Sequence, residues 1–147
     1  MFDKENRNRG FYDFVLNQVQ RCPWVSKTTE SEWLKKATFD LGVDPFEASS
    51  LILGATSAGK VFVETEVDRI LDDLVASFAG RRGRLSYPAF RQLTMAVKHM
   101  ARGGLDQKQA EQLVKDAVLR QQLKPAGRGP LVSKRWYRVA GSKEVKS

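Results

Sequence analysis

Six apolar residues between Val67 and Phe78 follow an unbroken helical repeat, which limits most strongly what this chain can fold into. They occupy positions i, i+3, i+4, i+7, i+8 and i+11, the spacing of one face of an α-helix. Five acids lie near the N-terminal end of the repeat, where the helix dipole favours them: Glu64, Glu66, Asp68, Asp72 and Asp73. The pattern predicts a helix over residues 65–79, capped by Thr65, with an acidic outer face.

Helical spacing of apolar residues predicts five further helices. In chain order their ranges are 11–22, 29–42, 44–54, 87–102 and 106–123. Asp44 precedes Pro45, a pairing typical of a helix start. Asp106 forms a capping pair with Gln109. Because strands and helices do not alternate, the sequence predicts an all-α fold, a compact bundle of about six helices.

Length and composition predict one domain with flanking segments. A chain of 147 residues is long enough to bury a sizeable core. We assign residues 1–10 to a polar leader, 11–123 to the helical domain and 124–147 to a basic linker and arm. Leu131–Val139 in this arm is open to three interpretations: a short strand pair, a docked arm or an extended segment. The last eight residues are expected to be disordered.

A cytoplasmic, soluble protein is expected. Cys22 is the one cysteine, so a disulfide framework within the chain is excluded and a reducing compartment is favoured. The N-terminus has no apolar run typical of a secretory signal, and no stretch is long enough to cross a bilayer. Because Cys22 lies on the apolar face of the predicted helix 11–22, we expect its thiol to be buried.

The positive charge is concentrated in two places. The net charge is +8, yet residues 1–119 carry 17 Lys/Arg against 16 Asp/Glu, while residues 120–147 carry eight against one. No acid occurs between Asp73 and Asp106. Such blocks favour an anionic partner: nucleic acid, a membrane surface or an acidic protein face. The candidate binding residues are Arg81, Arg82, Arg84, Arg91, Lys98, Arg102, Lys134, Arg135, Trp136, Tyr137 and Arg138.

A possible phosphate-binding loop runs from Gly54 to Lys60, where the spacing matches G-x-x-x-x-G-K. The next position should carry a hydroxyl that holds magnesium, and it is Val61 instead. The preceding segment also has a helical pattern rather than that of a strand. We therefore interpret Gly54–Gly59 as a structural turn between two helices.

The segment 81–90 resembles the second half of an EF-hand calcium loop. Gly83 stands where that motif needs a sharp turn, Leu85 follows two residues later, and Phe90 opens the exiting helix. Gly59 and Val61 match the same pattern in the first turn. TerB-type helical modules are similarly built from helices separated by glycine turns. The resemblance implies a short contact between Val61 and Leu85, but no metal, because the oxygen ligands of the motif are missing.

Helices 87–102 and 106–123 also suggest a helix-turn-helix with a basic wing. The second helix offers polar side chains suited to base contacts, namely Gln107, Lys108, Gln109, Gln112 and Lys115. Its acids Glu111 and Asp116 oppose DNA binding. In the tail, cations alternate with Trp136 and Tyr137, as in proteins that stack bases. Alternatively, these aromatics fold back over a groove while the arginines meet the acidic face of helix 65–79.

Catalytic chemistry is not predicted. His99 is the one histidine, and spacing assigns no base to any nucleophile. We expect no cofactor and no enzymatic activity. The sequence predicts a binding or adaptor module that contacts a protein partner through its basic surface and C-terminal arm. The alternative is a nucleic-acid-binding protein that uses the 81–102 surface, the 87–123 helix pair and the tail.

Overall fold

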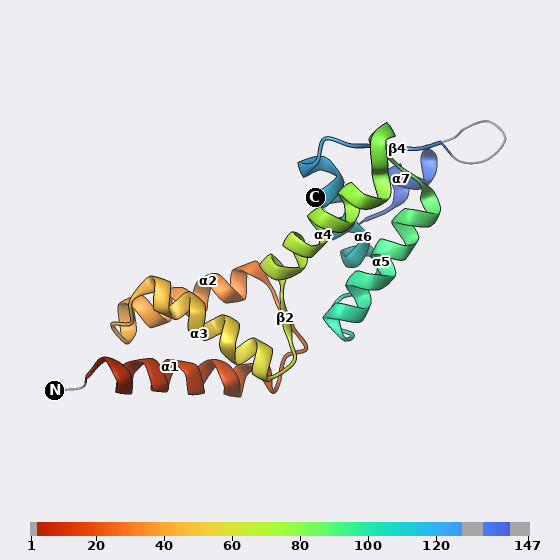
Figure 1. The fold of residues 1–147 in the computed structure, drawn as a ribbon. Helices are drawn as coiled ribbons and strands as arrows, with labels where there is room; N and C mark the ends of the chain where they lie inside the picture. Colours follow the sequence, from red (N-terminus) through yellow and green to blue (C-terminus); the bar gives the residue numbers. More distant parts are fainter. Residues whose placement is uncertain (1–2, 128–133, 142–147) are drawn as a thin grey trace. The chain divides into compact units, whose positions relative to one another are not determined.

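The chain is mostly helical. The computed structural model describes residues 3–127 and 134–141. These residues form seven α-helices: α1 Lys4–Val19, α2 Lys27–Lys35, α3 Pro45–Ala58, α4 Glu64–Ala79, α5 Tyr87–Ala101, α6 Gln107–Arg120 and α7 Arg135–Val139 (Figure 1). A π-helical segment, Lys36–Asp40, extends α2, and a 3-10 turn, Gly80–Arg82, follows α4. The predicted all-α class is confirmed.

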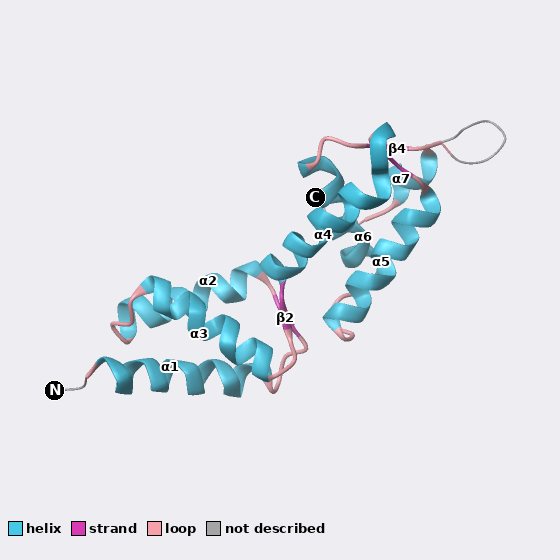
Figure 2. Cartoon of the chain, in the orientation of Figure 1, coloured by secondary structure: helices cyan, strands magenta, loops and turns pink. Residues whose placement is uncertain are grey.

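Four two-residue strands tie the helices together in pairs. They are β1 Trp24–Val25, β2 Phe62–Val63, β3 Arg84–Leu85 and β4 Lys124–Pro125. β1 pairs with β2 and β3 with β4, both in parallel (Figure 2). The predicted contact between Val61 and Leu85 is wrong, because Leu85 pairs with Pro125 instead. Each strand pair encloses two helices in the sequence: α2 and α3 lie between β1 and β2, and α5 and α6 lie between β3 and β4.

The contacts group the chain into two compact units, residues 1–65 (unit 1) and 66–147 (unit 2). This differs from the single helical domain that we expected over residues 11–123. Residues 128–133 and 142–147, which include parts of the predicted linker, arm and disordered end, lie outside the described residues.

The core of unit 1 forms where α1 packs on α3. From α1 come Phe11 and Val15, both fully buried, and from α3 comes Ile52. Trp33 of α2 and Ala37 of the π-helical segment complete the helical part of the core. Burial of each of the larger side chains stabilises the folded state by roughly 1.5–3 kcal/mol.

The core of unit 2 forms where α5 packs on α6, and α4 contributes the fully buried Val67, Leu71 and Val75. The predicted buried stripe of α4 is rotated: Ala79 is buried, whereas Phe78 is 45% exposed. Asp68 is buried as well, at 8% exposure. An acid is tolerated there because Arg120 of α6 lies 3.7 Å from it and 2.9 Å from Asp72. Thr65 lies inside the helix and does not cap it.

The boundaries of α1 correct two predictions. The helix begins at Lys4, capped by the side chain of Asp3, so residues 4–10 are helical and not a polar leader. It ends at Val19, before the predicted end at residue 22. Cys22 therefore follows the helix, and its side chain is exposed, not buried.

The boundaries of α3 correct the predicted turn over Gly54–Gly59, since most of this segment is helical. The helix starts at Pro45 with Asp44 as its cap, as predicted, but it continues to Ala58 and so includes Gly54. Gly59 ends the helix. Its hydrogen atom faces Val19, since a Cβ there would lie 2.8 Å from Val19 Cγ2. A close approach of two helices accounts for this glycine.

The other helix starts follow local capping rules. α6 has the predicted capping box between Asp106 and Gln109. α2 begins earlier than expected, because Ser26 caps it instead of Thr29 or Ser31. Ser86 caps α5 in the same way, directly after β3.

The two units share one order of elements: helix, strand, helix, helix, strand. β1 and β3 are 60 residues apart, and so are the caps Ser26 and Ser86. In the second half the shift is 62 residues, as between the caps Asp44 and Asp106. α3 and α6 are each followed by a left-handed residue, Lys60 at φ +58° and Gln122 at φ +57°, again 62 apart. Unit 2 adds α7 to this plan.

Candidate partner-binding site

The aromatic residues of α7 dock on α5. The ring of Trp136 lies 5.3 Å from the rings of both Tyr87 and Phe90, in edge-on geometry. Tyr137 lies 6.0 Å from Phe90. The indole N–H of Trp136 donates a hydrogen bond to the carbonyl of Ala126 at 3.1 Å. Edge-on aromatic pairs of this kind contribute about 0.5–1.5 kcal/mol beyond the area they bury.

The C-terminal end of α7 is held by α6. Three hydrogen bonds join them: Lys108 Nζ to Val139 O at 2.6 Å, Lys115 Nζ to Ala140 O at 3.2 Å, and Gly141 N to Glu111 Oε1 at 2.9 Å. Cationic donors suit the free carbonyls at a helix end. Of the three interpretations of the arm, residues 134–141 therefore follow the docked one, as a helix and not a strand pair.

This docking weakens the helix-turn-helix interpretation. The two helices and their short turn are present, but Lys108 and Lys115 of α6 hold α7. Gln112 donates a hydrogen bond to Asp116, and Gln109 completes the cap. The polar side chains that were expected to reach base edges are thus engaged within unit 2.

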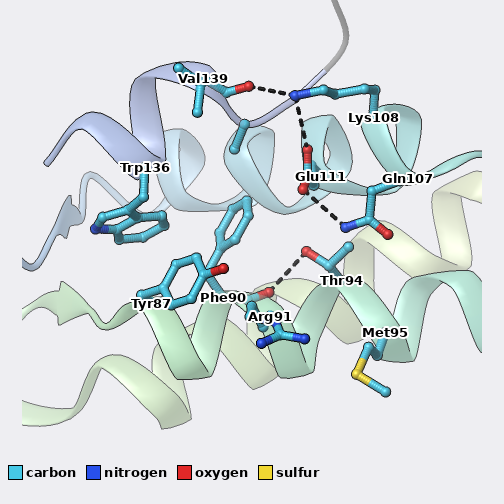
Figure 3. A pocket seen from close by; sticks show the side chains of 11 residues that line it. Tyr87, Phe90, Arg91, Thr94, Met95, Gln107, Lys108, Glu111, Trp136 and Val139 are labelled. Atoms are coloured by element: carbon cyan, nitrogen blue, oxygen red, sulfur yellow. Dashed lines mark hydrogen bonds and ion pairs between the residues drawn. The ribbon is translucent and has the colours of Figure 1, made fainter. Parts of the chain in front are cut away.

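A cavity of about 330 Å³ lies where α5, α6 and the α7 segment meet. Figure 3 shows Trp136 and Tyr87 at one end of it and Gln107 and Lys108 at the other. The hydroxyl of Thr94 in the cavity wall already has a hydrogen-bond partner, because it donates to the carbonyl of Phe90 at 2.9 Å. The volume is at the small end of known ligand pockets and suits one or two side chains.

A basic face on α5 adjoins this cavity. Arg91 and Lys98 recur at i and i+7, which places them on one side of the helix, and Arg102 follows as its left-handed C-cap. Met95 lies between them and is 64% exposed. Arg91 and Met95 also line the cavity. We call Arg91, Met95, Lys98 and Arg102 the α5 basic face.

Two residues of this face make contacts of their own. The guanidinium of Arg91 lies 5.9 Å from the ring of Tyr87. Lys98 Nζ donates to the side chain of Gln107 at 3.1 Å. Neither contact neutralises the charge, so both cations remain available to an anion.

The remaining predicted cations lie in two other places. Arg81, Arg82 and Arg84 are exposed around Gly83, which has the left-handed φ of +63°. Among the described residues, no ion pair joins these three arginines to a carboxylate. The arm cations Lys134, Arg135 and Arg138 are exposed on the α7 segment.

The acidic face of α4 forms ion pairs with α6 and within its own helix. Asp68 and Asp72 pair with Arg120 of α6, and Glu66 pairs with Arg69 on the same helix. The sequence had suggested that the arm arginines meet these acids. The arm is positioned by the packing of Trp136 and Tyr137 on α5 and by the hydrogen bonds from α6.

Burial changes the chemistry of one site residue. Desolvation raises the pKa of the Tyr137 hydroxyl above its ordinary value, and the nearby negative charge of Asp116 raises that pKa further. Lys115 Nζ lies 4.9 Å from the Tyr137 ring. Tyr137 is thus held neutral where α7 meets α6.

The anchoring residues were missed at the sequence level. Lys108, Glu111 and Lys115 hold α7, and Gly141 ends it with a φ of +95°. Charged residues on a helix usually face solvent, so nothing in the sequence marked them as a docking surface. The shift of 62 residues between the units matches each position of α6 to one of α3, and this match is the signal in the sequence that relates the two helices.

The described residues show neither a metal-binding cluster nor a membrane-spanning helix. They contain no group of three or more His, Cys, Asp or Glu side chains that could hold a metal ion. None of the described helices is both long and apolar enough to span a bilayer.

Comparison with known proteins gives no match: no family model, no curated protein and no solved structure matches the chain. The EF-hand-like and TerB-like resemblance therefore stays a prediction from the sequence.

Proposed function

We propose that the protein is a non-enzymatic binding module that recognises an acidic segment of a partner protein. The observation that carries the proposal is that Arg91 and Met95 belong both to the α5 basic face and to the wall of the 330 Å³ cavity. Cations and an insertion site for an apolar side chain thus adjoin one another.

In this complex the two parts have different roles. Arg91, Lys98 and Arg102 attract carboxylates, which sets the approach and orientation of the segment. The exposed thioether of Met95 adapts to apolar partners of varied shape. An aromatic or aliphatic side chain of the segment enters beside Tyr87 and Trp136, where burial supplies most of the affinity.

Binding of synthetic peptides tests the proposal. We expect a glutamate-rich peptide with one central tryptophan to bind the full chain, and the same peptide with serine at that position to bind at least roughly tenfold more weakly, about 1.4 kcal/mol. Replacing Arg91 and Lys98 by alanine should reduce binding by a similar factor. Replacing the exposed Arg9 and Lys35 of unit 1 is the matched control and should leave affinity unchanged. Equal binding of both peptides would overturn the cavity's role.

Nucleic-acid binding is the alternative, carried by the exposed arginines at 81, 82 and 84. Phosphate neutralisation makes affinity for a polynucleotide fall steeply as salt rises. A mobility-shift titration with single-stranded oligothymidine at low and moderate salt separates the two. A complex that forms at low salt, weakens steeply at moderate salt and survives Arg91→Ala would favour this alternative.

A further inference from the structure

The outer face of α3 in unit 1 is exposed and carries no charge. Phe46 and Leu53 are 85% and 52% exposed, and Ser50 and Ser57 are exposed between and after them. These four residues recur at i, i+4, i+7 and i+11, so they share one side of the helix. Glu47, the one charged residue of α3, pairs instead with Lys4 of α1 at 3.2 Å.

The corresponding face in unit 2 is partly covered: Leu119, which matches Ser57, is 76% exposed, whereas the positions that match the other three residues lie against the α7 segment. A shift of 62 residues takes Phe46 to Lys108 and Leu53 to Lys115, the two lysines that hold the end of α7. The same shift takes Ser50 to Gln112, whose side chain lies against Gly141. The shared plan of the two units therefore places a docked segment on this helix face in unit 2.

The side chains on the outer face of α3 favour a bound segment that differs from α7. The α7 segment is held by lysine ammonium groups that donate to its last carbonyls. Phe46 and Leu53 have no such donors, so the α3 face fits an uncharged helix side with apolar residues of its own. α3 itself has this property.

The face is also self-complementary. Large and small side chains alternate along it: Phe46, Ser50, Leu53, Ser57. When two copies of α3 pack antiparallel about a two-fold axis between residues 51 and 52, Phe46 of each copy lies opposite Ser57 of the other. Leu53 then lies opposite Ser50. Facing large residues with small ones is the arrangement that lets two helices interdigitate.

We infer that the chain self-associates through antiparallel pairing of α3 between two copies. The helix is about 21 Å long from its 14 residues at 1.5 Å each. One helix pair gives a small interface, so the dimer is weak and reversible.

Sedimentation equilibrium of the full chain from about 10 µM to about 1 mM tests this inference, because that range covers weak association. The mean mass should rise from 16.6 kDa towards twice that value. Ser50→Glu places a charge opposite Leu53 and should keep the chain monomeric throughout. Ser77→Glu, at an exposed helix serine of unit 2, is the matched control and should dimerise like the parent. Unchanged circular dichroism in both variants shows that they fold.

A swap of two residues tests the register. Leu53→Ser alone should weaken the dimer, and adding Ser50→Leu should restore it, because the large residue then faces the small one again. A parent chain that stays monomeric at all concentrations would overturn the inference. So would a dimer that Ser50→Glu leaves intact, or a double variant that associates no better than Leu53→Ser.

Discussion

Units 1 and 2 share a plan of elements but differ in what surrounds it. Residues 1–65 carry 8 Lys/Arg against 9 Asp/Glu, whereas residues 66–147 carry 17 against 8. Unit 2 has a helix docked over α6, and unit 1 leaves the matching side of α3 exposed. The shared part is therefore the buried framework, and the differences lie in the surfaces that meet other molecules.

Matching core positions make the framework visible. Phe11 and Val15 of α1 correspond, 60 residues later, to Leu71 and Val75 of α4, and all four are fully buried. Position and apolar character are kept while side-chain size changes. Elements of this kind tolerate different sequences as long as the total volume fits.

The largest expected effect comes from emptying one core at a time. Phe11→Ala should destabilise unit 1 by about 3–5 kcal/mol, and Leu71→Ala should destabilise unit 2 by about 2–5 kcal/mol, because each leaves a cavity in a closed core. Hydrogen exchange during urea unfolding reports the two units separately. If either substitution removed protection equally from both units, they would be one cooperative block and the comparison would fail.

A smaller effect is expected where α3 ends against α1. Gly59→Ala places a Cβ 2.8 Å from Val19 Cγ2 and should cost about 1–3 kcal/mol. Unit 2 has the opposite arrangement, with small Ala79 and large Gln121 at the matching positions. Val19→Ala should therefore offset much of the cost, and a double-mutant cycle measured by thermal unfolding gives the coupling. Additive effects would show that the contact does not set the packing.

The docking of α7, which only unit 2 has, should depend on pH. Because burial raises the pKa of Tyr137 in the docked state, docking is fully stabilised below the ordinary tyrosine value of 10.0 and is lost as pH rises through the higher docked value. Backbone NMR signals of residues 134–141 follow the release. Tyr137→Phe should move it to higher pH. Release at the same pH in that variant would assign the dependence to other groups.

The smallest effect concerns the left-handed residue after each helical pair. Gln122→Gly should stabilise unit 2 by about 0.5–1 kcal/mol, since glycine adopts a φ of +57° without steric cost. Gln121→Gly is the matched control, because Gln121 is right-handed at φ −85° and glycine should destabilise there. Lys60→Gly should behave like Gln122→Gly, and a difference in sign would show that the two ends are not equivalent.

The sequence predicted what local chemistry decides. The starts of α3 and α6 were found because Asp44 and Asp106 cap helices within three residues of themselves. The strand pairs were missed because they join residues about 40 positions apart, and no turn signal connects them. The side of α4 was misjudged at Phe78, since the apolar spacing fits two overlapping faces and packing selects one.

The candidate site was predicted in part. Its cations and aromatics were identified from charge and composition, and the fold-back of Trp136 was one of the alternatives. The cavity was not predicted, because it needs α5, α6 and α7 to meet. Lys108 and Lys115 anchor the arm by donating to backbone carbonyls. Because every residue has a backbone carbonyl, the sequence does not show which ones accept these bonds.

The two parallel strand pairs have a consequence for synthesis of the chain. They close loops from Trp24 to Phe62 and from Arg84 to Lys124, and the second loop begins only after the first has ended. Every element of unit 1 has therefore been synthesised before any strand of unit 2 is made. Domains commonly fold as units in this order, N-terminal first. The emerging chain can bury its first core while the basic half is still being translated.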